Sequence, residues 1–297
     1  MMRKITLSAP AKINLTLDVL GSRPDGYHQI ETIMQTISLA DGVRITAEPG
    51  GGIDVTCAAG REWGAERLPP AGPGNLAHRA AVVLAGVTGG RQGAAIVIEK
   101  HIPMAAGLGG GSADAAAVLW GLNRLWGALL SGPELERLGA ELGSDVPFCL
   151  RGGTVLGRGR GEELEELPDL PSAWVVLVNP RLSLSTAQVY RVWNRRADAD
   201  LSSAKFLEAQ KAGGLARAAG AMANGLEAAA FSLCPEVKAI LDRLRRAKGI
   251  LGACLSGSGP TVFGLAAEKA AAEKAAAEFA AAGHWTRLAR TLNRKER

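Results

Sequence analysis

The stretch PMAAGLGGGSADAA, residues 103–116, places four glycines within five positions ahead of a serine and a run of alanines. It is not a Walker A loop, because no lysine lies between Pro103 and Arg124. It is not a dinucleotide-binding fingerprint either, because Ser112 and Asp114 stand where that motif needs glycine or alanine. Such a stretch can converge backbone N–H groups on an anion, or it can form a plain turn or hinge. Both interpretations are open at this point.

The neighbours of this stretch favour a connection between a strand and a helix. Residues 94–99 (AAIVIE) predict a strand, and residues 112–126 show helical spacing of apolar residues, with Ser112 as the expected N-cap. The positive end of a helix dipole would then face the glycines. A phosphate site without its own lysine needs Mg²⁺ or a basic side chain from another element.

Two residues elsewhere could complete a phosphoryl-transfer site. Lys12 lies on the polar face of residues 11–20, whose alternation predicts a half-buried strand, and taken alone it is more commonly a solvated lysine. Asp145 follows a predicted helix end in LGSDVP, residues 142–147, and taken alone it is more commonly a local turn or cap residue. Phosphoryl transfer to a hydroxyl needs positioning, charge stabilisation and a proton acceptor, which the loop, the lysine and the aspartate could supply.

The composition bounds the classes of protein to consider. A length of 297 residues predicts about two domains, and 47% hydrophobic with 21% charged residues is typical of a globular protein. Neither a membrane span nor a secretory signal is predicted, so we expect a cytoplasmic protein. The four cysteines form no CxxC and the four histidines no HExxH, which argues against a zinc or redox site. The net charge of +5 suits anionic ligands, although the basic residues are spread along the chain.

The pattern of elements predicts a mixed α/β (α+β) protein with domains at residues 1–165 and 166–297. In the first domain we expect strands at 11–20, 33–39, 43–47 and 94–99, with a hairpin turn at 40–42. We also expect helices at 75–84, 112–126 and 131–143, and one long loop at 58–74. In the second we expect strands at 174–178, 250–255, 261–265 and 285–289, helices at 186–196, 215–230, 236–248 and up to 282, and a turn at 256–260. This order is the split βαβ, ferredoxin-like pattern.

Several segments together resemble the galactokinase, homoserine kinase and mevalonate kinase (GHMP kinase) superfamily: APAKINLTL (9–17), RPDGYHQIETIMQTISL (23–39), PMAAGLGGGSADAA (103–116), LGSDVPFCL (142–150) and LSGSGPTVFG (255–264). The glycine-rich stretch marks the superfamily. DGYH and GSDVPF mark the narrower family of 4-diphosphocytidyl-2-C-methyl-D-erythritol kinases of the non-mevalonate isoprenoid pathway. The resemblance implies a ribosomal-S5-domain-2-like domain followed by a ferredoxin-like domain, and ATP-dependent phosphorylation of the substrate's 2-hydroxyl.

The resemblance also implies roles for residues at the acceptor side. Asp145 would be the general base, Lys12 would stabilise charge and hold the hydroxyl, and Asn14 would orient the substrate. A second group would bind the cytosine, by stacking, by reading its edge and by forming the opposite wall of the pocket: Tyr27, His28, Thr186 and Tyr190.

On the nucleotide side the resemblance implies a phosphate loop and an adenosine pocket. The loop would consist of Pro103, Met104, Ala105, Ala106, Gly107, Leu108, Gly109, Gly110, Gly111, Ser112 and Ala113, and the pocket would include Asn75, Leu76 and Lys100. ATP and Mg²⁺ are the expected co-substrate and metal, and the metal ligands are not identified. Ala105 departs from the family, which often has glycine there, so a positive φ at this position would cost about 1 kcal/mol.

Two other functions compete with this one. Another kinase of the superfamily, acting on homoserine or mevalonate, would share the glycine-rich loop but would not need the DGYH segment. An RNA-binding protein could use RGGTVLGRGRG, residues 151–161, although the strand-like centre and the acidic run that follows favour a β-hairpin. We expect a small-molecule substrate, no nucleic-acid or membrane partner, and a monomer or weak homodimer.

Overall fold

The computed structural model describes residues 3–60, 68–90, 92–194 and 201–296. They form two compact units built from interleaved segments. The first unit consists of Met1–Ala11, Leu39–Met104 and Gly109–Arg151, and the second of Lys12–Ser38, Ala105–Leu108 and Gly152–Arg297. Because the units interleave, they do not correspond to one cut in the chain, and the expected boundary between residues 165 and 166 stays a prediction.

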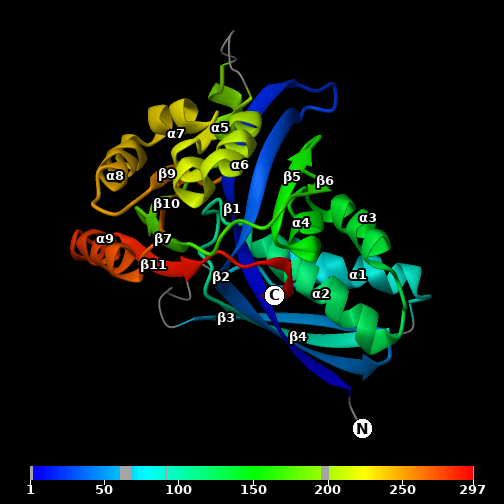
Figure 1. Cartoon of the computed structure of the whole chain (residues 1–297). Coiled ribbons are helices and arrows are strands. Elements are labelled where there is room, and N and C mark those ends of the chain that lie inside the picture. Colours follow the sequence, from blue (N-terminus) through cyan, green and yellow to red (C-terminus); the bar gives the residue numbers. More distant parts are fainter. Residues whose placement is uncertain (1–2, 61–67, 91, 195–200, 297) are drawn as a thin grey trace. The chain divides into compact units, whose positions relative to one another are not determined.

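The first unit combines strands and helices (Figure 1). It holds β3 (Ile53–Ala59), β4 (Gln92–Lys100), α1 (Leu76–Val87), α2 (Gly110–Trp126), α3 (Gly132–Leu142) and α4 (Val146–Arg151), with a 3₁₀ turn at Gly72–Gly74. It also holds parts of β1 (Lys4–Ser22) and β2 (His28–Pro49). Strand β4 pairs in parallel with β3 and antiparallel with β2. The predicted strand at 94–99 and the three predicted helices are therefore confirmed.

Helix α2 packs against the sheet of the first unit, and several residues on its buried side are small. Ala113, Ala115 and Ala116 are buried in this helix. At Gly121, a Cβ atom would lie 2.6 Å from Cδ1 of Ile45, which is closer than side chains approach one another. The absence of that side chain lets the helix pack closely on the sheet at this point.

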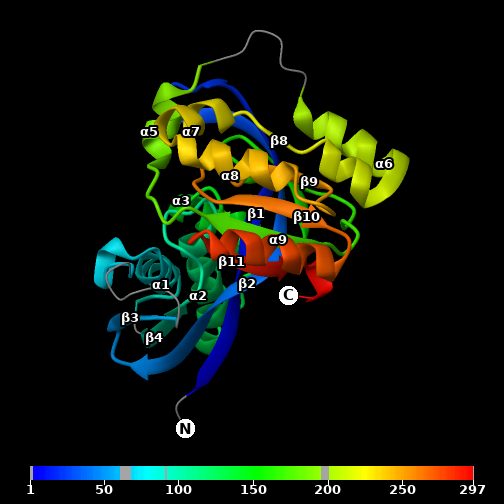
Figure 2. The same cartoon turned by 90° about the vertical axis from the view of Figure 1, so that its left-hand side faces the viewer.

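The second unit contains a four-stranded antiparallel sheet in the order β11-β7-β10-β9. Its elements are β5 (Thr154–Arg158), β6 (Glu163–Glu166), β7 (Trp174–Asn179), α5 (Thr186–Val192), α6 (Ser202–Gly220), β8 (Ala223–Asn224), α7 (Glu227–Leu233), α8 (Pro235–Arg245), β9 (Gly252–Leu255), β10 (Val262–Ala266), α9 (Lys269–Ala281), β11 (Trp285–Arg290) and a 3₁₀ turn at Arg294–Glu296. Helices α8 and α9 pack on this sheet through one apolar core (Figure 2). The strand order and the helix placement confirm the ferredoxin-like prediction.

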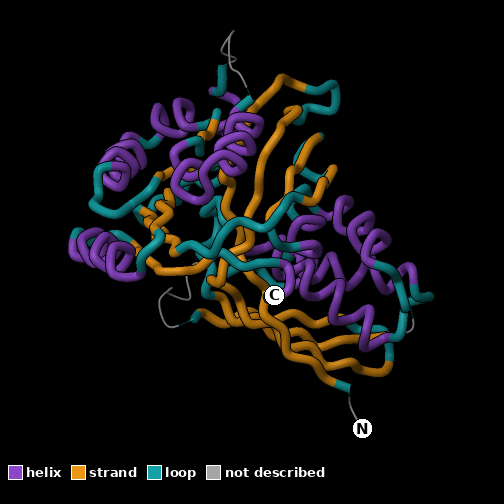
Figure 3. Tube along the Cα trace, viewed as in Figure 1, coloured by secondary structure: helices purple, strands orange, loops and turns teal. Residues whose placement is uncertain are grey.

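The predicted hairpin at residues 40–42 is wrong. Strand β2 runs without interruption from His28 to Pro49 (Figure 3). Alanine, aspartate and glycine form a typical turn composition, but Asp41 is buried and pairs with Lys100 instead. Asp41 is therefore present as a buried partner of Lys100 and not as a turn residue.

Other boundaries also differ from the expected ones. The predicted helix at 215–230 is divided between α6 and α7 by the short strand β8. Helix α2 begins at Gly110 with Gly109 as its N-cap, so Ser112 is not the cap. Parts of the predicted loop at 58–74 and of the predicted helix at 186–196 lie outside the described residues.

The strand at residues 11–20 is confirmed within β1, but its half-buried character is not. Lys12, Asn14 and Thr16 on the predicted polar face are buried, as are the apolar residues between them. The same face therefore carries buried polar groups that need hydrogen-bond partners. In the described part of the chain, no helix is long and apolar enough to cross a membrane.

Candidate functional site

Residues 105–108 of the glycine-rich stretch belong to the second unit. Gly107 has a φ of +76°, and a Cβ atom there would lie 2.1 Å from the main-chain oxygen of Ser256. Only glycine fits this position without displacing backbone. The hydroxyl of Ser256 donates to the main-chain oxygen of Gly107 at 2.9 Å, and the amide N–H of Lys12 donates to the carbonyl of Leu108 at 3.0 Å. The stretch is thus packed against β1 and the turn at 256–260.

Ala105 adopts a left-handed backbone conformation, with a φ of 49°. A backbone cost is expected from the sequence if φ is positive at this position, and φ is positive. Alanine therefore carries a local backbone cost at the entrance of the stretch.

Lys12 and Asn14 lie side by side on β1 in a chain of hydrogen bonds. The ammonium group of Lys12 donates to Oδ1 of Asn14 at 2.7 Å, and Nδ2 of Asn14 donates to Oγ1 of Thr32 at 2.8 Å. The hydroxyl of Thr32 then donates to the main-chain oxygen of Thr16 at 2.6 Å. The chain of donors fixes which way the Asn14 amide faces, so its oxygen is turned toward Lys12.

The turn at residues 256–260 (SGSGP) lies against this pair, although no role was assigned to it from its motif. A Cβ atom at Gly257 would lie 3.4 Å from the Lys12 ammonium nitrogen and 3.5 Å from Oδ1 of Asn14. Asn224 holds the turn by donating to the carbonyls of Leu255 at 2.9 Å and Gly257 at 2.8 Å. The signal for this neighbourhood was present in the quoted LSGSGPTVFG motif, but Asn224 lies outside every motif.

Thr186, expected in the cytosine pocket, is connected to the same turn. Its Oγ1 lies 2.8 Å from Oγ of Ser258, and either hydroxyl can be the donor. Thr186 is also the first residue of α5, which carries Tyr190. The turn that lies against Lys12 therefore also contacts the helix that supplies two of the expected substrate residues.

An aromatic group in the second unit brings together two of the expected cytosine-binding residues. The rings of His28 and Tyr190 have centroids 4.8 Å apart with planes tilted by 35°. Trp193, which the sequence analysis did not assign, contacts His28 edge-on at 5.6 Å. Tyr27 is 54% exposed, and the guanidinium of Arg160, also not assigned, lies 4.9 Å from its ring centroid.

Asp145 lies at the start of α4 in the first unit and is half-buried. Its main-chain oxygen accepts the N–H of Cys149 at 3.0 Å, which is the first turn of that helix. The segment approaches α2, since a Cβ atom at Gly143 would lie 3.9 Å from Oγ of Ser112. Asp145, Ser112 and the beginning of α2 thus belong to one neighbourhood of the first unit, whereas Lys12 belongs to the second unit.

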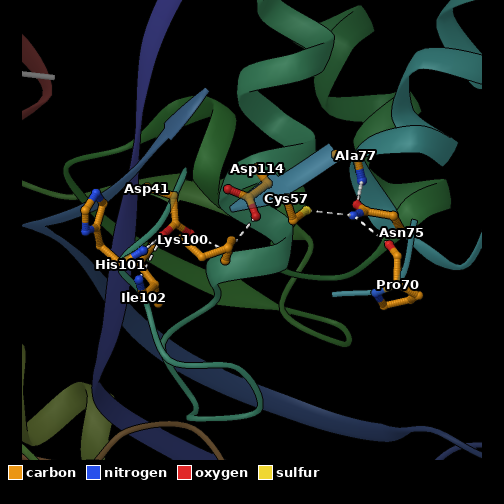
Figure 4. A network of polar contacts seen from close by, with 9 residues as sticks. All are labelled: Asp41, Cys57, Pro70, Asn75, Ala77, Lys100, His101, Ile102 and Asp114. Carbon is orange, nitrogen blue, oxygen red and sulfur yellow. Dashed lines mark hydrogen bonds and ion pairs between the residues drawn. The ribbon is translucent and has the colours of Figure 1, made fainter. Parts of the chain in front are cut away.

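Lys100, expected in the adenosine pocket, is buried at the end of β4 between two acids (Figure 4). Its ammonium group pairs with Asp41 and with Oδ2 of Asp114, the latter at 2.6 Å. Oδ1 of Asp41 also accepts the main-chain N–H groups of His101 at 2.5 Å and Ile102 at 2.8 Å. One lysine therefore serves two carboxylates in this cluster.

The pKa values in the cluster reflect burial and the presence of one lysine between two carboxylates. Burial raises the pKa of Asp114 to about 7, and the pull of Lys100 in the other direction does not offset it because Asp41 competes for the same cation. For Lys100, burial lowers the pKa, but the two acids outweigh this effect and the pKa is raised overall. Lys100 is therefore held in its charged form, while the raised pKa of Asp114 favours its protonated form below a pH of about 7.

Asn75 and Leu76, also expected at the adenosine, lie at the start of α1. Oδ1 of Asn75 accepts the N–H of Ala77 at 2.9 Å and caps the helix, while Nδ2 donates to the carbonyl of Pro70 at 3.1 Å and contacts the sulfur of Cys57 at 3.5 Å (Figure 4). The amide is thus engaged in local bonds. The roles of Asn75, Leu76 and Lys100 toward adenosine stay predictions.

Comparison with known proteins identifies the group to which this arrangement belongs. The family model described as GHMP kinases N terminal domain matches residues 75–153, and the one described as GHMP kinases C terminal matches residues 203–284. The chain is 49% identical, over 89% of its length and 90% of the relative's, to a 4-diphosphocytidyl-2-C-methyl-D-erythritol kinase of Pelotomaculum thermopropionicum. It is 48% identical, over 90% of its length and 92% of the relative's, to the protein of that name from Moorella thermoacetica.

A solved structure agrees with these relatives. The crystal structure of a 4-(cytidine 5'-diphospho)-2C-methyl-D-erythritol kinase matches 97% of this chain and 99% of its own, with 38% identity and a TM-score of 0.75. The fold and the sequence similarity extend over both matched domains. The chain therefore belongs to the 4-diphosphocytidyl-2-C-methyl-D-erythritol kinase family of the GHMP kinases.

Proposed function

We propose that the protein transfers the γ-phosphoryl group of ATP to the 2-hydroxyl of 4-(cytidine 5'-diphospho)-2-C-methyl-D-erythritol. The observation that carries this proposal is the 49% identity, over 89% of the chain, to a curated kinase named for that substrate. A kinase of the homoserine or mevalonate type is not favoured by this similarity. The RNA-binding alternative loses its main support, because Thr154–Arg158 and Glu163–Glu166 pair as an antiparallel hairpin in the segment that resembled an RGG tract.

On the acceptor side, Lys12 and Asn14 hold and orient the reacting hydroxyl. The fixed direction of the Asn14 amide supports this assignment, because a preorganised donor and acceptor pair loses little freedom when substrate binds. The ammonium group of Lys12 supplies positive charge where negative charge develops in transfer. The hydroxyl gives its proton to the carboxylate of Asp145 as the oxygen attacks the γ-phosphorus and the bond to the β-phosphate oxygen breaks.

The cytidine end is recognised by the aromatic group. Tyr27 stacks on the cytosine with the ring face opposite Arg160, and His28 reads the base edge from a position fixed by Tyr190 and Trp193. Thr186 and Tyr190, both on α5, form the other wall. An exposed Tyr27 supports this role, since a stacking platform must be reachable by the ligand.

On the nucleotide side, the glycine-rich loop wraps the ATP phosphates with main-chain N–H groups at the start of α2. Within the described ranges, no group of three or more histidine, cysteine, aspartate or glutamate side chains could hold a metal ion. We infer that a magnesium ion would come with the nucleotide phosphates and keep water ligands, as this ion commonly does. It would supply charge neutralisation for the transferred group, and we assign no protein ligand to it.

A comparison of acceptors tests the substrate. The purified protein is assayed with ATP and four acceptors, which are the cytidyl-linked alcohol, methylerythritol phosphate, homoserine and mevalonate. We expect turnover with the first only, because Tyr27 and His28 have nothing to bind in the others. Equal rates with and without the cytidyl group would remove the role given to these two residues, and turnover of homoserine or mevalonate would replace the proposed substrate.

The general base is tested by Asp145→Asn, which keeps the side-chain shape and removes the proton acceptor. We expect kcat to fall by about 10²–10⁴-fold while the dissociation constant for ATP stays nearly unchanged. Glu141→Gln on α3 is the matched control, because it neutralises an exposed acid of the same unit. Near-normal kcat in the Asp145 variant would contradict the assignment. Cytoplasmic location and a monomer or weak dimer are not tested by any of these features and stay predictions.

A further inference from the structure

The glycine-rich loop has both of its ends in the first unit. It leaves the sheet after Lys100, the last residue of β4, and it ends where α2 begins at Gly110. The shape of a loop depends on how far apart its two ends are held and in which directions they point. Contacts that tie the two ends to each other therefore control how the N–H groups of the loop are presented.

The entry to the loop is held by Asp41 on β2. Its Oδ1 accepts two consecutive main-chain N–H groups, those of His101 and Ile102, which are the first two residues after β4 (Figure 4). A carboxylate that accepts two neighbouring N–H groups fixes the direction of the backbone at that point. The same carboxylate pairs with Lys100, so the end of β4 and the first residues of the loop share one anchor.

The exit is held by the other bond of the same lysine. The ammonium nitrogen of Lys100 donates to Oδ2 of Asp114, the fifth residue of α2, at 2.6 Å. The first turn of α2 also touches the entry directly. A Cβ atom at Gly110 would lie 2.9 Å from Cγ2 of Ile102 and 3.4 Å from Nζ of Lys100. Glycine at this position lets the two ends of the loop meet.

We propose that Lys100, together with Asp41 and Asp114, is a positioning residue that sets the spacing of the two ends of the glycine-rich loop and so preorganises it for the phosphates of ATP. This rests on the proposed function, in which that loop binds ATP. In this proposal the ammonium group of Lys100 acts through the loop, whereas the family resemblance assigned Lys100 to the adenosine pocket.

Two further observations support this assignment. Lys100 is only 4% exposed and already donates to two carboxylates, so its ammonium group is turned inward to the cluster. Oδ1 of Asp114 is buried with no hydrogen-bond partner among the residues that the structure describes. An acid that is desolvated and half-satisfied is a costly way to stabilise a core, because apolar residues of the same volume would serve as well. Its use at the loop ends fits a geometric role.

The test is a double variant, Lys100→Met/Asp114→Leu, which replaces the pair by apolar side chains of similar size and leaves Asp41 on its two N–H groups. The dissociation constant of a non-hydrolysable ATP analogue is measured by calorimetry, and that of adenosine by competition. We expect the analogue to bind about 10–100-fold more weakly and adenosine to bind as in the unaltered protein. The KM for the acceptor should stay unchanged.

The control is Lys238→Met/Asp242→Leu, which makes the same changes in an exposed pair of α8 with a 2.5 Å bond. It should bind both ligands normally. Asp114→Asn keeps the bond between Lys100 and Asp41, and we expect a smaller loss for the ATP analogue in the same direction. This variant decides the matter if the double variant does not fold, as judged by circular dichroism.

Two outcomes would overturn the proposal. If the ATP analogue and adenosine lose affinity together, Lys100 acts at the nucleoside. If neither changes in a folded variant, the cluster serves only the core. These outcomes are separate from a failure of the proposed function, which would be seen in the unaltered protein as no transfer to the cytidyl-linked alcohol or no binding of the ATP analogue.

Discussion

Lys12 and Lys100 are both buried lysines on strands, yet their surroundings differ in kind. Lys100 in the first unit pairs with two acids, whereas Lys12 in the second unit donates to the neutral amide of Asn14. The Asn14 amide orients the Lys12 ammonium group, and a lysine held in a fixed direction suits action on a charged ligand. The two carboxylates tie Lys100 to the cluster at the end of β4, which suits a lysine that holds backbone in place.

The largest expected effect comes from the lysine beside the amide. Lys12→Met should lower kcat by about 10²–10³-fold, because it removes a preorganised positive group from the place where negative charge develops. The melting temperature should change little by comparison. Steady-state kinetics and thermal denaturation of the same sample check both statements, and a variant that melts early but keeps its kcat would reverse the comparison.

The other lysine should behave in the opposite way. Lys100→Met should lower the free energy of unfolding by about 3–5 kcal/mol, because it leaves two buried carboxylates without their cation. Urea denaturation measures this loss. The distinction between the two lysines is lost if Lys100→Met proves as stable as Lys12→Met.

The pH dependence of stability gives a third prediction, and it concerns Asp114 in the cluster around Lys100. Its pKa is raised to about 7 in the folded protein from an ordinary 3.8, so between these values the folded state holds a proton that the unfolded state has released. The free energy of unfolding should therefore fall as the pH rises from about 4 to about 7, by roughly 3–4 kcal/mol in total. The raised pKa of Lys100 acts only at higher pH and does not enter this window.

Asp114→Asn isolates this effect, because it removes one titrating group and leaves the rest of the protein as it was. Urea denaturation at pH 5, 6, 7 and 8 should give a difference between the two proteins that grows with pH and levels off above about 7. A difference that is constant with pH would mean that Asp114 keeps an ordinary pKa.

The smallest expected effect concerns two residues with left-handed backbone, one in each unit. Ala105 has a φ of 49° and Leu129, which is 90% exposed, has a φ of 56°. Ala105→Gly and Leu129→Gly should each raise the free energy of unfolding by about 0.5–1 kcal/mol, because glycine relieves the backbone cost. Only Ala105→Gly should alter the KM for ATP, since Leu129 is outside the loop. If the KM for ATP changed equally in the two variants, the loop entrance would have no particular role in ATP binding.

The ferredoxin-like half shows how far sequence patterns reach. Strands and helices there alternate with regular hydrophobic spacing, so β7, β9, β10 and β11 were all located and their order followed from the pattern. Local composition was misleading where a residue served a distant partner. Asp41 beside Gly42 resembled a turn because nothing nearby in the sequence reveals that its partner is Lys100, 59 residues away.

The site shows the same limit. The glycine-rich stretch, Lys12 and Asp145 could be selected from residue type and motif, and the family resemblance supplied their expected roles. Asn224 and Trp193 could not, because their roles depend on what they contact and neither lies in a recognised motif. Arg160 was noted only as part of the segment that resembles an RGG tract, and its contact with Tyr27 is a tertiary feature. A tertiary contact leaves no periodic trace in a sequence.

The sequence by itself determined the fold class, the family and the glycine-rich stretch, because hydrophobic periodicity and contiguous motifs are local properties that survive without a structure. Only the tertiary structure decided that Lys100 pairs with Asp41 and Asp114, that the polar face of β1 is buried, and that the turn at 256–260 lies against Lys12 and Asn14. Burial and pairing depend on segments far apart in the chain, and these set the charge state and orientation on which the chemistry depends.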